Sequence, residues 1–486
     1  MSCGTPTQSH HPPSRCALLL GLATFTACTC LPDRGPASAA TPAAPAPGAP
    51  AYPAPRTAGT VGDLFCINEV ANVPKLYFDR GALDGATLTR LLEDDVARAE
   101  ALGVRAGRVN SGAYPFLEWQ SARRDPTTLP RADQVVALLQ GAGMEIIMVL
   151  SPWPGNNTGA FTAQYVPADL DGYSAWIRAV VERYDGDGQD DMPGLARPVR
   201  LWEVDNEPDM HNHLPPKGGG QRGDGARAAE AQAEQNPFET PAEYAQVLVA
   251  TAQAIRAAQP DAVVFNGGTF YTANDTGRAY LAAVLAEPGA AAAVDALSVH
   301  AYFTDRTPEK YLAALDNAAS LAGARPIFVT ETSYPSAKEG KPWATLDRQA
   351  RMVPYVYGEA MARGVERVCW HSLGDPPAEK ARGGFATNSL YSAEGDIWAE
   401  RHALKPAGEV YRRLTTLLGE VPLADVRRVA VPDGRAVQVG DAGWLVYDGD
   451  DVAMPFTAGT VTNLLTGEVR PLEGSVAAPV LVVPAG

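Results

Sequence analysis

The chain has 486 residues, of which 46% are hydrophobic, so it is long enough for a large globular domain and a smaller second one. Its formal net charge of -16 excludes the basic surface that nucleic-acid binding requires, and no nucleic-acid partner is expected. The same charge disfavours electrostatic docking onto anionic lipid and leaves neutral ligands open.

The first 58 residues are expected to lie outside the globular part. Residues 16–27 are apolar and too short to span a bilayer as a helix, which predicts a signal peptide over residues 1–27. The tetrapeptide that ends in Cys28 (FTAC) resembles a bacterial lipobox, so Cys28 is predicted to be lipidated and to attach the mature protein to a membrane. Cleavage and release is the alternative. We therefore expect an exported protein, either secreted or held as a lipoprotein on the outer surface or periplasmic face of a bacterial membrane.

Residues 28–58 are rich in Pro and Ala and cannot bury enough apolar surface to order themselves, which predicts a disordered linker. From residue 59 to 418, short apolar runs alternate with stretches of helical periodicity. Such runs are typical of parallel strands covered on both faces. The predicted strands are Leu64–Asn68, Val104–Asn110, Glu145–Ser151, Val199–Asn206, Ala262–Gly267, Leu297–Tyr302, Ile327–Thr330 and Val368–Ser372.

Eight strand–helix units in one domain predict an α/β fold of the (β/α)8 TIM-barrel type. An open doubly wound sheet is the alternative, but no glycine-rich phosphate loop follows any predicted strand. Two of the six cysteines, Cys66 and Cys369, belong to this domain and fall on the first and eighth strands, which are neighbours in a closed barrel. Two buried thiols are favoured there over a disulfide.

Two polar stretches interrupt the barrel pattern. Residues 215–236 form an insertion after the fourth strand, for which a solvated excursion is favoured over a mobile lid. The earlier stretch from Asp185 to Asp191 (DGDGQDD) resembles Asp-rich calcium loops, so Asp185, Asp187 and Asp191 are candidate ligands of a structural Ca²⁺. A plain acidic turn is the alternative. No other cofactor is expected to be required.

From residue 419 to 486 the sequence changes to short β-type runs separated by turns such as Pro432-Asp433-Gly434. This pattern predicts a small antiparallel β domain packed on the barrel. It has few aromatic residues, so a structural role is favoured over a binding role.

Two glutamates follow predicted strands. Glu207 comes directly after the fourth strand, in Asn206-Glu207-Pro208, and Glu331 ends the seventh. Strand ends of one barrel can hold two carboxyl groups on opposite sides of a glycosidic bond, whose hydrolysis requires a proton donor and an ionised carboxylate. The positions predict Glu207 as the acid/base and Glu331 as the nucleophile.

With these residues the chain resembles the clan A glycoside hydrolases, retaining (β/α)8 β-glycosidases with the acid/base in an Asn-Glu-Pro motif after the fourth strand and the nucleophile at the end of the seventh. The resemblance covers roughly residues 60–418. It implies hydrolysis of β-glycosidic bonds in polysaccharide or oligosaccharide by double displacement. The third strand departs from the family, because Val149-Leu150-Ser151-Pro152 lacks the histidine that many members carry there.

The resemblance also implies roles for individual residues. Arg108 would support the nucleophile, Asn206 would bind the sugar 2-hydroxyl, and His300 and Tyr302 match a His-x-Tyr pair whose tyrosine aligns the nucleophile. Trp370 would form the aromatic floor beneath the reacting sugar.

Other residues near the strand ends have no family counterpart. Trp153 and Trp119 are candidate outer platforms for sugar. Glu203 is expected to be an ordinary salt-bridge partner, and His211 and His213 to be loop residues and not metal ligands. A non-catalytic, cell-surface glycan-binding lipoprotein is the alternative function.

Overall fold

The computed structural model describes residues 59–70, 85–109, 117, 119, 128–152, 166–210, 240–303, 307–338, 340–375, 386–393 and 402–485. The predictions for residues 1–58, which include the signal peptide and Cys28, lie outside the described residues. So do those for Trp153, His211, His213 and residues 215–236. Within the described ranges, no helix has the length and apolarity needed to cross a membrane.

Eight parallel strands form one sheet in the order β5-β4-β3-β2-β1-β8-β7-β6. Two isolated parallel bridges, Phe265 with Ala296 and Thr269 with Val299, join the two end strands and close the barrel. The predicted (β/α)8 barrel is therefore confirmed. The strands are β1 (Phe65–Asn68), β2 (Ala106–Val109), β3 (Glu145–Leu150), β4 (Leu201–Val204), β5 (Val263–Asn266), β6 (Leu297–His300), β7 (Ile327–Thr332) and β8 (Val365–His371).

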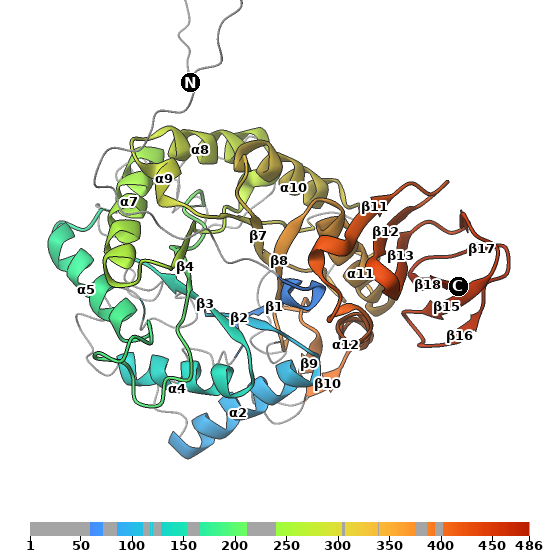
Figure 1. The fold of residues 1–486 in the computed structure, drawn as a ribbon, viewed down its shortest axis with the longest axis horizontal. Coiled ribbons are helices and arrows are strands. Elements are labelled where there is room, and N and C mark those ends of the chain that lie inside the picture. The colour runs from blue at the N-terminus through green and yellow to red at the C-terminus, as the bar shows by residue number, and fades with distance from the viewer. Residues whose placement is uncertain are drawn as a thin grey trace, which may run out of the picture. The chain divides into compact units, whose positions relative to one another are not determined.

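Helices surround the strands as a ring (Figure 1). Local sequence signals set where several of them begin: Thr240 and Glu243 form a capping box with Pro241 in the first turn of its helix, and the Asp169 and Thr345 side chains each cap another. The helices of the described barrel are α2 (Gly85–Ala101), α4 (Thr128–Gly141), α5 (Leu170–Glu182), α7 (Pro241–Ala258), α8 (Asp275–Ala286), α9 (Ala290–Ala293), α10 (Glu309–Ala322), α11 (Leu346–Ala362) and α12 (Pro406–Leu418).

The two faces of each strand have different surroundings. Outward side chains pack against the helices in the main core, whereas inward side chains such as Cys66, Ala106 and Leu201 form a small separate apolar cluster. Two residues further along the same strands, the inward positions hold Asn68, Arg108 and Glu203. Because side chains alternate along a strand, the inside of the barrel changes from apolar to polar toward the carboxyl ends of the strands.

Cys66 and Cys369 form a disulfide between β1 and β8. The two strands pair in parallel with Cys66 directly opposite Cys369, and both side chains point into the barrel. The expectation that these cysteines lie on neighbouring strands is correct, but the preference for two free thiols is wrong. The direct register and shared inward direction bring the sulfur atoms together.

The C-terminal part is a six-stranded antiparallel sheet in the order β11-β12-β13-β18-β15-β16, with a short β14–β17 pair beside it. This confirms the predicted β domain. It packs on α11, where Gly358 lies so close to the Tyr447 ring that a Cβ would clash, and Glu359 pairs with Arg435. The strands of this domain are β11 (Val426–Val429), β12 (Arg435–Val439), β13 (Gly443–Asp448), β14 (Val452–Ala453), β15 (Gly459–Asn463), β16 (Val469–Pro471), β17 (Ser475–Val476) and β18 (Val480–Pro484). A separate antiparallel pair is formed by β9 (Tyr391–Ala393) and β10 (His402–Leu404).

Candidate active site

Glu331 lies near the end of β7, with its side chain inside the mouth of the barrel. Arg108 Nη1 donates to Glu331 Oε1 over 2.7 Å, and the Tyr302 hydroxyl donates to Oε2 over 2.5 Å. Burial alone would raise the pKa of Glu331, but the positive charges of His300 and Arg108 and the Tyr302 hydrogen bond lower that pKa to about 2. Glu331 is therefore an ionised carboxylate at neutral pH.

Glu207 follows β4 and has a different environment. Its Oε1 lies 2.7 Å from His300 Nδ1, and its side chain keeps 17% of its surface exposed. Both Glu207 and Asp205 have left-handed backbone conformations, with φ of 51° and 68°. Such conformations cost about 1–3 kcal/mol each and occur preferentially at functional sites. The strained turn directs the Glu207 carboxyl group toward the inside of the barrel mouth.

His300, on β6, lies between the two carboxyl groups. Its Nδ1 is 2.7 Å from Glu207 and 3.6 Å from Glu331 Oε2, and one ligand atom of each of the three side chains lies within 4.8 Å of the others. Burial lowers the pKa of His300, but the Glu331 charge and the Glu207 hydrogen bond outweigh it and raise the pKa. Three such groups could surround a cation, and His300 Nδ1 lies at hydrogen-bonding distance from Glu207 Oε1.

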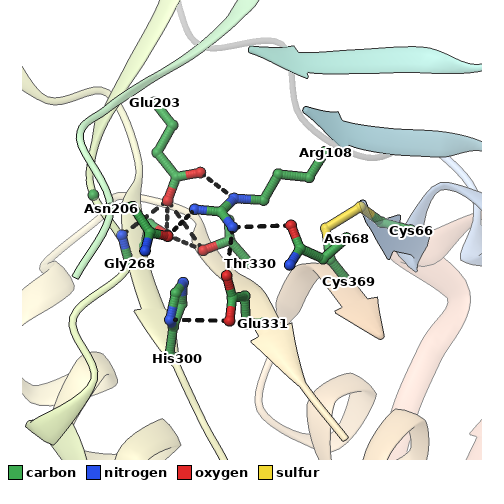
Figure 2. Close-up of polar contacts among 12 residues, drawn as sticks. Cys66, Asn68, Arg108, Glu203, Asn206, Gly268, His300, Thr330, Glu331 and Cys369 are labelled. Atoms are coloured by element: carbon green, nitrogen blue, oxygen red, sulfur yellow. Dashed lines mark hydrogen bonds and ion pairs between the residues drawn. A yellow bond between two sulfur atoms is a disulfide. The ribbon is translucent and has the colours of Figure 1, made fainter. Parts of the chain in front are cut away.

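Arg108 is the centre of the buried network shown in Figure 2. Besides Glu331, it donates through Nε to Glu203 Oε2 at 2.5 Å, through Nη1 to Asn68 Oδ1 at 3.0 Å, and through Nη2 to Asn206 Oδ1 at 2.8 Å. Burial lowers the pKa of Arg108, but the two glutamates more than offset this effect. The guanidinium is fixed in place by four oxygen acceptors, one of which is the candidate nucleophile.

Glu203 is more than an ordinary salt-bridge partner. Its side chain is fully buried, and its Oε1 accepts hydrogen bonds from Gly268 N, Ser298 Oγ and Thr330 Oγ1. The carboxylate thus ties β4 to β5, β6 and β7 while it holds Arg108. A charge in the middle of the apolar run Leu201–Val204 is the sequence signal for such a role, because a buried charge requires a partner.

Asn68 and His371 are site residues that the sequence interpretation missed. Because Arg108 donates to the Asn68 Oδ1, the amide nitrogen of Asn68 faces His371 and donates to its Nδ1 over 2.9 Å. An accepting Nδ1 means that a neutral His371 ring carries its proton on Nε2. Asn68 therefore sets both the orientation and the tautomer of His371.

The assignment of Trp370 as the sugar floor is wrong. Trp370 is completely buried in the core outside the barrel, and its Nε1 donates to the Asn388 carbonyl oxygen. Its neighbours along β8, Cys369 and His371, point inward, so the alternation of the strand turns Trp370 toward the helices. The inward position at the mouth belongs to His371, whose ring lies edge-on 6.3 Å from Tyr302.

Trp119 is not an outer platform either. It is 8% exposed and packs against Tyr173 and Trp176, with ring centroids 6.1 and 5.8 Å away, so its role in the structure is packing. The other predicted residues of the described part, namely Arg108, Asn206, Glu207, His300, Tyr302 and Glu331, come together at the carboxyl ends of the strands.

The acidic turn after α5 remains a predicted calcium site. The structure brings the carboxylates of Glu182, Asp185 and Asp187 within 4.8 Å of one another. Burial, together with the charges of its acidic neighbours, raises the pKa of Asp185 to about 6. Asp191 is not in this group, and its two oxygens accept hydrogen bonds from the backbone of Gly186 and Gly188. Glu182 takes the place that the sequence interpretation gave to Asp191.

No protein-family model matches the sequence, and no curated protein matches it. Solved structures do match this chain. A family 39 glycoside hydrolase from the gut symbiont Bacteroides cellulosilyticus has a TM-score of 0.55 at 14% identity, over 87% of this chain and 80% of that one. A glucosidase from Croceicoccus marinus has a TM-score of 0.52 at 14% identity, over 88% and 83%. A family 51 α-L-arabinofuranosidase from Bifidobacterium longum has a TM-score of 0.51 at 14% identity, over 88% and 95%.

These similarities define the class of fold. The chain shares its (β/α)8 barrel fold with these glycoside hydrolases, and two carboxyl groups lie at the carboxyl ends of its fourth and seventh strands.

Proposed function

We propose that the protein is a retaining glycoside hydrolase, which cleaves β-glycosidic bonds in polysaccharides or oligosaccharides by double displacement. The observation that carries the proposal is the pair Glu207 and Glu331, whose nearest oxygens lie within 4.8 Å at the mouth of the barrel. Retaining enzymes hold their two carboxyl groups about 5–5.5 Å apart, whereas inverting enzymes need about 6.5–9.5 Å to admit a water. The separation supports retention.

In the first step, an oxygen of Glu331 attacks the anomeric carbon, and the bond from that carbon to the leaving oxygen breaks. Glu207 transfers its proton to the leaving oxygen, which departs as an alcohol. In the second step, Glu207 takes a proton from water, whose oxygen displaces Glu331 from the anomeric carbon. Two inversions give net retention, and both carboxyl groups return to their starting state.

The neighbouring residues support this division of roles. Arg108 and Tyr302 each donate to a different oxygen of Glu331, which keeps it ionised and aligned for attack. The hydrogen bond between His300 Nδ1 and Glu207 Oε1 fixes the orientation of the acid/base. Asn206 is held by Arg108 beside both glutamates, which suits contact with the sugar 2-hydroxyl.

A non-catalytic glycan-binding lipoprotein is the second candidate. It would need aromatic and polar residues at the barrel mouth, but not an ionised carboxylate held by a buried arginine and a tyrosine. Keeping charges out of water costs several kcal/mol per ion, which favours a catalytic use of the network.

Export is part of the proposal. The Cys66–Cys369 disulfide supports it, because disulfides persist mainly in oxidising compartments. Cys28 lipidation, membrane attachment and structural calcium are proposals of the same kind, and they rest on the sequence patterns described above.

The test is hydrolysis of a panel of aryl β-glycosides (glucoside, xyloside, mannoside, galactoside, fucoside and arabinoside) together with soluble β-glucans, xylan and mannan. The full-length wild type is compared with Glu331→Gln, with calorimetric sugar binding as a second readout. The proposal predicts activity on at least one substrate and its loss in the variant. Binding without hydrolysis across the panel would instead establish the glycan-binding protein.

A further inference from the structure

The segment after β5 carries two aromatic residues beside the candidate acid/base. Asp209, two residues after Glu207, accepts hydrogen bonds from the backbone N–H groups of Phe270 (2.8 Å) and Tyr271 (2.7 Å). Asp209 is buried, and each of its two carboxylate oxygens accepts one of these hydrogen bonds. The position of the aromatic pair is thereby fixed to the loop that carries Glu207.

The ring of Phe270 joins the site. Its centroid lies 5.9 Å from that of Tyr302, whose hydroxyl holds Glu331, and 5.1 Å from that of Tyr271 in an edge-on arrangement. Tyr302 is buried, but Phe270 and Tyr271 remain partly exposed. Their exposed aromatic surface lies next to Tyr302 at the mouth of the barrel, where a ligand bound at the two glutamates could reach it.

The strand order decides which part of a substrate would meet these rings. Glu331 attacks the anomeric carbon, and Glu207 protonates the oxygen of the leaving group, so the leaving group lies on the Glu207 side. Phe270 follows β5, next to β4 with Glu207, whereas Asn68 and His371 lie on β1 and β8 at the opposite side of the mouth. The aromatic pair is therefore on the leaving-group side.

We propose that Phe270, flanked by Tyr271, is a platform for the sugar ring of the leaving group and so determines specificity for oligosaccharide over simple glycoside. This inference rests on the proposed glycosidase function. The apolar C–H face of a pyranose has the size and character to pack on an exposed aromatic ring. Asp209 is a positioning residue, because it acts on substrate only through the backbone of the platform.

The experiment compares two substrates that share a glycone. Matched pairs of a β-linked disaccharide and the β-glycosyl fluoride are prepared for glucose, xylose and mannose, because fluoride is a leaving group with no ring to pack on Phe270. Full-length Phe270→Ala should lose about tenfold more in kcat/KM on the disaccharide than on the fluoride, because only the disaccharide has a leaving-group ring to pack on Phe270. Phe270→Tyr, which retains the ring, should restore disaccharide hydrolysis.

Two further variants keep the test decisive. Phe270→Leu fills the site without an aromatic face, so it should reproduce the loss even if the alanine variant folds poorly. Phe456→Ala removes a partly exposed ring between β14 and β15 of the C-terminal domain, and kcat/KM on both substrates should stay at the wild-type value. Equal loss on both substrates, or none, in Phe270→Ala and Phe270→Leu would overturn this inference and leave the proposed function standing. A wild type that cleaves no pair and no member of the wider panel of glycosides and polysaccharides would overturn both.

Discussion

Arg108 and Glu331 form a buried ion pair, with arginine Nη1 2.7 Å from glutamate Oε1 and side-chain exposures of 0% and 8%. The arginine is held from its other side by Glu203, so the position of the candidate nucleophile depends on a second carboxylate that substrate does not reach. This relationship couples the stability of the barrel to the position of the candidate nucleophile.

Replacement of Glu203 by Gln should reduce both stability and activity. The change leaves Arg108 without its main buried counter-charge, and breaking a buried pair costs about 3–5 kcal/mol. Denaturant unfolding measures this loss. Glu420→Gln is the matched control, because Glu420 pairs with Arg105 at the surface with 85% of its side chain exposed, and such pairs contribute less than about 1 kcal/mol. Equal effects of the two substitutions would contradict the account.

Tyr302→Phe should move the acid limb of the kcat/KM pH profile to higher pH. The tyrosine hydrogen bond is one of the interactions that lower the pKa of Glu331 to about 2, so its removal raises that pKa, and the carboxylate protonates at higher pH as the solution is acidified. A hydrogen bond to a charged group contributes about 1.5–3 kcal/mol, which corresponds to a loss of roughly 10- to 100-fold in rate. An unshifted acid limb would show that Tyr302 does not control the ionisation of Glu331.

Gly268→Ala should impair catalysis without removing any reactive group. A Cβ at this position would meet the His300 ring and Thr330 Oγ1 well inside van der Waals contact, so the ring must shift and its contact with Glu207 is disturbed. We expect a fall in kcat/KM with a native circular dichroism spectrum. Gly141→Ala, where a Cβ meets nothing within 4 Å, is the control and should keep wild-type activity. Full activity in the Gly268 variant would mean that the position of His300 is unimportant.

The Cys66–Cys369 disulfide links residues 303 apart in sequence and should stabilise the barrel. The double substitution Cys66→Ala/Cys369→Ala is expected to lower the free energy of unfolding by about 2–5 kcal/mol, since the unfolded chain gains freedom without the crosslink. Denaturant unfolding measures the change. Peptide mapping of the non-reduced wild type should recover the linked peptides, and their absence would contradict the pairing.

The strands of the barrel could be predicted because parallel strands buried on both faces form apolar runs that end near polar residues. The same property explains the error at Trp370. The run Val368-Cys369-Trp370 has no alternation of polar and apolar residues, so the sequence does not indicate which side chains point inward. The disulfide was not predicted because the register between β1 and β8 is a property of the closed barrel.

The candidate catalytic pair could be predicted from its position after two strands, whereas several of the residues that hold the site in place could not. Asn68 and His371 lie on strands that are distant in sequence and meet only when β1 pairs with β8. Glu203 carried a signal, a lone charge in an apolar strand, that a search for buried partners would have used. Phe270 carried no such signal, because its proposed role as a platform depends on the hydrogen bond from its backbone N–H to Asp209.

The central claim is double displacement by Glu331 and Glu207, and the most direct test is the anomeric configuration of the first product. Proton NMR follows hydrolysis of an active aryl β-glycoside before mutarotation mixes the anomers. The account predicts that the β-anomer appears first and the α-anomer only later. Initial release of the α-anomer would show inversion, and would contradict both the nucleophilic role of Glu331 and the close pairing of the two carboxyl groups on which the proposal rests.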